Sequence, residues 1–214
     1  MLELGNVFIL GDSYSTFEGY IPEAYDAYYT ARGREDSDVC EVNHTWWYRL
    51  LEETDANLVK NCSFSGTTIC NTGYEGRDCS DISFISRMEE LFKNNYFEEN
   101  NVNTFFLFGG TNDSWADSPI GELKYGNWKK EDLFFVLPAF CYLLNELSKN
   151  LKDTKVYCIL NTELKPEIEN GFVSACKQYD VSVIRLKNID KTSGHPTVKG
   201  MKQIKEQILL AVGI

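Results

Sequence analysis

The chain has 214 residues, 43% of them hydrophobic, and a net charge of −11. This length supports one sizeable core, so we expect a single domain over residues 1–214. The acidic balance argues against binding to nucleic acid or to an anionic membrane surface, because both need clustered Lys and Arg. No apolar run approaches the length of a membrane span.

The amino terminus and the cysteines bear on the cellular compartment. Residues 1–4 lead straight into an apolar run, without the basic and apolar segments of a signal peptide. We therefore expect a cytoplasmic protein, although a secreted chain that is already processed would look the same. Seven cysteines without a CxxC pair favour free thiols over a disulfide framework. Cys141, Cys158 and Cys176 lie in apolar segments and are expected in the core.

The first predicted element is a strand over residues 7–10, which stops at Gly11 and is followed by Asp12 and Ser13. Apolar runs predict further strands at 57–62, 104–108, 155–160 and 181–185. Helical spacing predicts helices at 43–53, 82–95, 131–151, 166–179 and 197–210. Strands that alternate with such helices indicate a three-layer α/β/α sandwich of about five parallel strands, with helices on both faces.

Two segments are less regular. Pro138 is expected to kink the helix at 131–151 or to offset its start. Residues 14–38 are rich in tyrosine and turn formers, and we expect them to cross the top of the sheet with little regular structure. Their tyrosines either line a pocket for a flat polar ligand or pack the loop against the body, and we favour the packing role.

Short polar clusters follow the predicted strands. In an open parallel sheet, ligands bind beyond the carboxyl ends of the strands, so clusters at these ends should share one surface. The clusters occupy residues 11–13, 65–67 and 109–113, and a fourth, at 193–196, lies before the last helix.

These clusters carry the parts needed for acyl transfer. Ser13 can act as a nucleophile once a base removes its proton, and His195 has a suitable ordinary pKa. The other histidine, His44, precedes an aromatic helix, where a surface or capping role is expected. Oxyanion donors are available from the backbone N–H groups of Ser13 and Gly66 and from the side-chain amide of Asn112.

The whole set resembles the SGNH superfamily of GDSL-type esterases and lipases. The resemblance rests on Gly-Asp-Ser at 11–13, the isolated Gly66, Gly-Gly-Thr-Asn-Asp at 109–113 and His195, which stand in the family's order along the chain. It implies a flavodoxin-like sandwich, acyl transfer through an acyl-serine intermediate, and no metal or organic cofactor. Residue by residue, it assigns the nucleophile to Ser13, the base to His195, and oxyanion donors to Gly66 and Asn112.

The acid of the catalytic triad is the point where the sequence departs from the family. The family pattern has Asp three residues before the histidine, where this chain has Thr192. The nearest upstream carboxylate is Asp190, and we predict that two extra residues, Gly194 among them, loop out and bring Asp190 to His195. The alternative is a Ser-His dyad in which a backbone carbonyl or a hydroxyl orients the imidazole.

The neighbours of the predicted site residues have simpler roles. Asp12 is expected to make structural hydrogen bonds at the strand end. Asp113, Trp115 and Asp117 follow Asn112 and either line one wall of the pocket or pack the loop.

The predicted function is a serine esterase that hydrolyses small or carbohydrate-linked acyl esters, such as acetyl esters. Two alternatives remain: an acyltransferase to a sugar hydroxyl, and a non-catalytic carbohydrate-binding domain on the same fold. The intact Ser13, Gly66, Asn112 and His195 argue against the non-catalytic domain. The expected partner is therefore a small-molecule or carbohydrate ester, with neither nucleic acid nor membrane.

Overall fold

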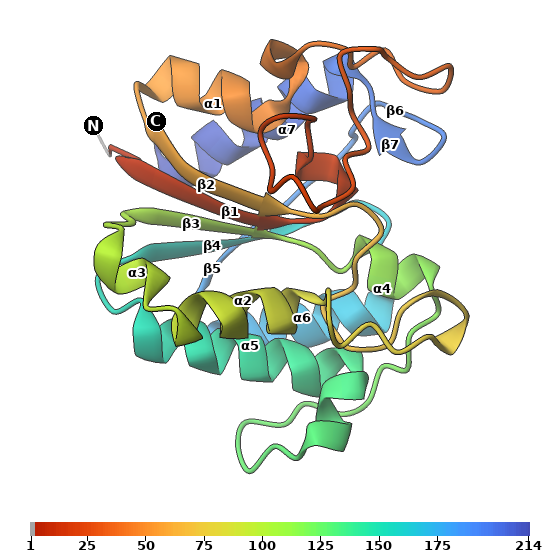
Figure 1. Cartoon of the computed structure of the whole chain (residues 1–214), viewed down its shortest axis with the longest axis vertical. Helices are drawn as coiled ribbons and strands as arrows, with labels where there is room; N and C mark the ends of the chain where they lie inside the picture. Colours follow the sequence, from red (N-terminus) through yellow and green to blue (C-terminus); the bar gives the residue numbers. More distant parts are fainter. Residues whose placement is uncertain (1–2) are drawn as a thin grey trace.

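The structure, a computed structural model, describes residues 3–214 and is built around one parallel sheet (Figure 1). The strands lie in the order β2-β1-β3-β4-β5, and each neighbouring pair is parallel. Their bounds are β1 Asn6–Gly11, β2 Asn57–Ser63, β3 Thr104–Phe108, β4 Lys155–Leu160 and β5 Ser182–Arg185. The predicted five-stranded parallel sheet is confirmed.

Helices cover both faces of the sheet, which confirms the three-layer sandwich (Figure 1). One face carries α1 Trp46–Thr54 and α7 Val198–Val212. The opposite face carries α2 Phe84–Lys93, α5 Val136–Asn150 and α6 Pro166–Gln178. Two short helices, α3 Tyr96–Glu99 and α4 Thr111–Trp115, precede and follow β3. Within residues 3–214, no helix is long and apolar enough to cross a membrane.

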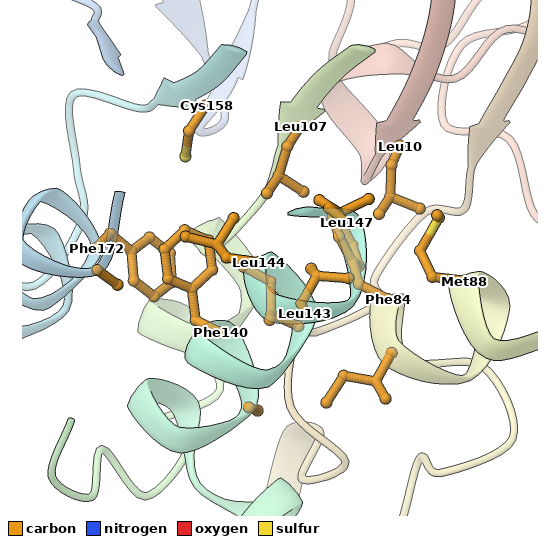
Figure 2. Packing of buried hydrophobic residues seen from close by; sticks show 14 of the residues in the cluster. Leu10, Phe84, Met88, Leu107, Phe140, Leu143, Leu144, Leu147, Cys158 and Phe172 are labelled. Carbon is orange, nitrogen blue, oxygen red and sulfur yellow. The ribbon is translucent and has the colours of Figure 1, made fainter. Parts of the chain in front are cut away.

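The hydrophobic core has two halves, one on each side of the sheet. Phe105 and Leu107 of β3 belong to the half under α2, α5 and α6, whereas Phe106 and Phe108 belong to the other half. Successive side chains of a strand point to opposite faces, so an unbroken apolar strand must be covered on both. Figure 2 shows the first half, where Leu107 faces the side chains of α5. The buried positions of Cys141, Cys158 and Cys176 confirm their expected core role.

Local chemistry sets where the helices begin. Thr45 caps α1 by accepting a hydrogen bond from the Tyr48 N–H at 3.4 Å, and Thr197 caps α7 through the Gly200 N–H at 3.1 Å. The helix predicted over 131–151 is divided into a 3-10 helix at Lys130–Phe134 and α5. Pro138 lies in the first turn of α5, where a missing N–H costs no hydrogen bond. Of the two predictions for Pro138, the offset start of the helix is therefore confirmed and the kink is wrong.

The segment after β1 has little regular structure, as predicted. It contains a 3-10 helix at Ser13–Ser15 and an isolated bridge between Arg34 and Ser37. Tyr29 is fully buried, and its hydroxyl donates to the Pro196 carbonyl at 3.2 Å. Tyr29 thus packs the loop against the body. Tyr28 has a different environment, described with the site below.

Candidate active site

Ser13 and His195 meet at the carboxyl edge of the sheet. Ser13 follows β1 directly, and its Oγ lies 2.9 Å from Nε2 of His195, which is 182 residues away in the sequence. Asp12 shapes this turn because its Oδ1 accepts a hydrogen bond from the Tyr14 N–H at 3.1 Å and caps the 3-10 helix that starts at Ser13. The expected structural role of Asp12 is confirmed. The structure therefore brings a hydroxyl and an imidazole into hydrogen-bond contact.

A β-hairpin that was not predicted presents His195. Its strands, β6 Lys191–Thr192 and β7 His195–Pro196, pair antiparallel with Thr192 opposite His195. The two turn residues, Ser193 and Gly194, have φ values of 50° and 78°. Two consecutive positive φ values are typical of the tight turns that form two-residue hairpin loops. The Tyr14 hydroxyl donates to the Gly194 carbonyl and so ties this turn to the residue after Ser13.

The prediction that Asp190 reaches His195 is wrong in this structure. Asp190 lies before β6, opposite Thr197, and its Oδ2 accepts a hydrogen bond from the Thr197 hydroxyl at 2.5 Å. The ammonium of Lys199 lies 3.5 Å from the other carboxylate oxygen. The two extra residues form the hairpin turn instead of looping out. In the register of the hairpin, Thr192 pairs with His195, and Asp190 lies two residues before Thr192.

A backbone carbonyl takes the place of the carboxylate. Nδ1 of His195 lies 3.3 Å from the carbonyl oxygen of Ser193. A carbonyl oxygen can only accept a hydrogen bond, so this contact favours the tautomer with the proton on Nδ1. The lone pair is then on Nε2, which faces the Ser13 hydroxyl.

Burial of the imidazole lowers the pKa of His195 below its usual value, and the positive charges of Arg34 and Lys191 act in the same direction. The Ser193 carbonyl and the Asp36 carboxylate oppose this shift. His195 is therefore neutral around pH 7, which is the form that can accept a proton.

Gly66 lies in the loop after β2, and its backbone is open to solvent. It has a φ of 76°, and no atom lies within 4 Å of the position that a Cβ would occupy. No hydrogen bond within residues 3–214 uses the N–H of Gly66 or of Ser13. Asp113, fully buried, holds this loop by accepting hydrogen bonds from the Ile69 N–H at 2.9 Å and the Cys70 N–H at 3.2 Å.

The amide of Asn112 has a fixed orientation beside Gly66. Its Nδ2 donates to the Thr67 carbonyl at 3.0 Å, and its Oδ1 accepts from the Tyr74 hydroxyl at 2.7 Å. One N–H of the amide remains for a ligand, because a primary amide nitrogen carries two. Tyr74 was missed by sequence reasoning, since it lies 38 residues from Asn112 and in a 3-10 helix of only three residues, Tyr74–Gly76.

A buried arginine braces the two strand ends. Arg87 of α2 donates to the Gly11 carbonyl at 3.3 Å, to the Cys62 carbonyl and to the Thr67 hydroxyl at 3.0 Å. These bonds connect the turn of Ser13 with the loop of Gly66. The burial of Arg87 could not be predicted from the helical pattern, because that pattern assigns apolar residues to the buried face of a helix and charged residues to the exposed face.

Aromatic side chains surround His195. The Trp115 ring lies 5.7 Å from the imidazole, centroid to centroid, and Trp115 is 38% exposed. Of the three residues considered for a pocket wall, only Trp115 is at the site: Asp113 is buried behind the loop, and Asp117 pairs with Lys165 at the surface. Tyr28 stacks on the imidazole, although sequence reasoning favoured a packing role for the tyrosines of its loop. Within residues 3–214, no group of three or more His, Cys, Asp or Glu is arranged to hold a metal ion.

The fold and site place the chain in the class of three-layer α/β proteins with a Ser-His pair and amide donors at the strand ends. Its sequence matches the family model of GDSL-like lipase/acylhydrolase over residues 5–212, and the chain belongs to this family, whose members act on ester bonds. No curated protein sequence matches the chain.

Solved structures agree with this assignment. A GDSL-like lipase from Bacteroides ovatus is 44% identical, with a TM-score of 0.91 and a coverage of 98% of each chain. One from Bacteroides uniformis is 43% identical, with a TM-score of 0.91 over 98% of this chain and 95% of that one. An acetyl xylan esterase from the rumen bacterium Butyrivibrio proteoclasticus shares the fold at 15% identity, with a TM-score of 0.61 over 98% and 63% of the two chains.

Proposed function

We propose that the protein is a serine esterase in which Ser13 is the nucleophile and His195 the general base. The observation that carries this proposal is the 2.9 Å contact between Ser13 Oγ and Nε2 of a His195 whose lowered pKa keeps it neutral. A neutral imidazole in hydrogen-bond contact with a hydroxyl is the arrangement that activates a serine.

The reaction has two steps. Ser13 Oγ attacks the ester carbonyl carbon while its proton moves to Nε2 of His195, and the resulting oxyanion accepts hydrogen bonds from Ser13 N–H, Gly66 N–H and the free N–H of Asn112. The imidazolium then gives its proton to the departing alcohol, which leaves an acyl-serine. Water, deprotonated by His195, attacks the acyl carbon, and the acid departs as the proton returns to Ser13.

Orientation of the base falls to the hairpin. The Ser193 carbonyl accepts the Nδ1 hydrogen of His195, so the pair acts as a dyad without a carboxylate. A buried carboxylate would stabilise the imidazolium more strongly than a neutral carbonyl. The dyad therefore relies on positioning and on the oxyanion donors.

We further propose that the substrates are small acyl esters of carbohydrates. Ser13 and Asn112 are 3% and 2% exposed, and a recessed nucleophile of this kind suits a small acyl group. Tyr74 and Trp115, both partly exposed, offer aromatic faces on which the apolar face of a sugar ring can stack. The acetyl xylan esterase with the same fold supports this substrate class.

Ester hydrolysis by purified protein tests the proposal. We expect turnover of p-nitrophenyl acetate, slower turnover of the octanoate, and release of acetate from acetylated xylo-oligosaccharides. Ser13→Ala should lower kcat by at least about 10³-fold, since serine hydrolases lose this much or more without their nucleophile. Ser148→Ala, an exposed serine on α5, is the matched control and should behave as wild type. Equal rates in Ser13→Ala and wild type would refute the nucleophile assignment.

A further inference from the structure

One face of the His195 imidazole is covered by Tyr28. The two ring centroids are 3.6 Å apart and the planes differ by 5°, which is a parallel stack at contact distance. The Arg34 guanidinium lies 4.3 Å from the same Tyr28 centroid. Because the imidazole already fills one face of the phenol ring, Arg34 must lie over the other. Arg34, Tyr28 and His195 thus form a three-layer arrangement, which we name the base stack.

A carboxylate, that of Asp36, holds the Arg34 and Tyr28 layers of the base stack. Arg34 Nε donates to Asp36 Oδ1 at 2.9 Å, and the Tyr28 hydroxyl donates to Asp36 Oδ2 at 3.2 Å. Two residues further on, Asp38 Oδ1 accepts a hydrogen bond from the Val198 N–H at 2.9 Å, at the start of α7. The loop that carries the stack is therefore held to the segment that carries His195.

The imidazole needs such support. Among the residues that the structure describes, the only hydrogen bond at its Nδ1 is the one to the Ser193 carbonyl, and its length of 3.3 Å is long for an N–H···O bond. Rotation of the ring about its bond to Cβ would carry Nε2 away from Ser13 Oγ. A parallel ring in contact with the whole imidazole face opposes this rotation, because the imidazole cannot turn out of its plane without meeting Tyr28.

We propose that Tyr28, backed by Arg34 and Asp36, is a positioning residue that keeps the His195 imidazole aligned with Ser13 Oγ, the role that a triad carboxylate has in other serine hydrolases. This inference rests on the proposed roles of Ser13 and His195. Tyr28 acts through the imidazole.

Labelling of Ser13 by a fluorophosphonate tests the proposal without knowledge of the natural ester. Ser13 Oγ displaces fluoride from phosphorus, and its proton passes to His195, so the limiting rate reports on the aligned pair. We expect Tyr28→Leu to lower this rate about tenfold, the size of one lost aromatic pair, with little change in the half-saturating reagent concentration. Tyr28→Phe keeps the ring and should stay close to wild type.

The pH dependence of labelling gives a second readout. Burial is the largest cause of the lowered pKa of His195, so Tyr28→Leu, which uncovers the ring, should move the acid limb to higher pH, and Tyr28→Phe should not. The other titratable or charged groups that face the imidazole remain in both variants: Tyr14, Tyr29, Arg34, Asp36 and Lys191.

Tyr20→Leu is the matched control, because Tyr20 lies in the same loop, is 43% exposed and packs on Trp47. It should label at the wild-type rate. If Tyr28→Leu does not fold, as judged by its thermal melt, Arg34→Ala tests the exposed layer, with an expected loss of about threefold for one cation–π contact.

Several outcomes would overturn the inference: a wild-type rate and acid limb in folded Tyr28→Leu, an equal loss in Tyr28→Phe and Tyr28→Leu, or, if Tyr28→Leu does not fold, a wild-type rate in Arg34→Ala. Absence of any label on Ser13 in the wild type would instead refute the proposed function, and with it the role assigned to Tyr28.

Discussion

At the scale of single residues, the site depends on hydrogen-bond partners that lie far away in the sequence. Asn112 is oriented by Tyr74 and Thr67, and His195 by the Ser193 carbonyl. Asp190 has a different role, because through Thr197 it joins the hairpin to the start of α7. The carboxylate nearest to His195 in the sequence is thus structural.

Asp190→Asn tests this interpretation. We expect kcat near the wild-type value, since the carboxylate does not contact the imidazole, and little loss of stability, since the Asn side-chain oxygen can still accept from Thr197. A triad acid would cost up to about 10⁴-fold in turnover. Steady-state kinetics of Asp190→Asn beside His195→Ala make the measurement, and a comparable collapse of kcat in both variants would restore Asp190 to the catalytic group.

At the scale of elements, strand ends could be predicted and the hairpin could not. The clusters at Ser13, Gly66 and Asn112 follow apolar runs whose ends are visible locally in the sequence. The two-residue strands β6 and β7 carry no periodic pattern, and their register depends on packing against Tyr14 and α7. The same holds for Tyr28, whose partner is 167 residues away in a loop without periodicity.

Gly194→Ala tests the hairpin as the element that presents His195, the proposed base. A Cβ at Gly194 would require a side chain at φ 78° and would lie 3.0 Å from the Trp115 ring. We expect a loss of about 1 kcal/mol in the free energy of unfolding and a fall in kcat of about tenfold as His195 shifts.

Gly213→Ala is the matched control for the hairpin variant. Gly213 follows α7 with a φ of 82°, and no atom lies within 4 Å of the position that a Cβ would occupy. An alanine there therefore strains the backbone in the same way but contacts no neighbouring side chain. Urea unfolding and ester hydrolysis of both variants separate the effects. If Gly213→Ala loses as much activity as Gly194→Ala, the hairpin has no special part in catalysis.

At the scale of the whole molecule, buried charge lies directly beneath the site. Three ionisable side chains are almost fully buried there, namely Asp12, Asp113 and Arg87. The apolar pattern of α2 does not indicate that this helix places Arg87 in the interior. Burial raises the pKa of Asp12 to about 7 and that of Asp113 to about 6. The fold therefore carries carboxyl groups that bind protons more tightly in the native state than in the unfolded chain.

This arrangement predicts an unusual pH dependence of stability. Asp12 has a pKa of about 7 in the native state and an ordinary value of 3.8, so between these values the native state holds more protons, and the contribution of Asp12 falls as the pH rises. The stability of Asp12→Asn relative to wild type should increase from about pH 4 to pH 7, with a slope of at most about 1.4 kcal/mol per pH unit, and then level off.

Urea unfolding of wild type and Asp12→Asn over this pH range measures the difference, with the exposed Asp153→Asn as control. Parallel stability curves for wild type and Asp12→Asn would show that Asp12 titrates normally.

The turn at Ser193 and Gly194 also limits how the chain can vary. A triad carboxylate constrains evolution through one side chain, which a single codon change removes. Here the acceptor for Nδ1 of His195, the proposed base, is a main-chain carbonyl, which every amino acid supplies. What must be conserved is a pair of residues that accept left-handed backbone, a requirement that Gly, Asn and Asp meet readily. The side chain at position 193 can then change among residues that accept this backbone conformation, while the orientation of the His195 imidazole is kept.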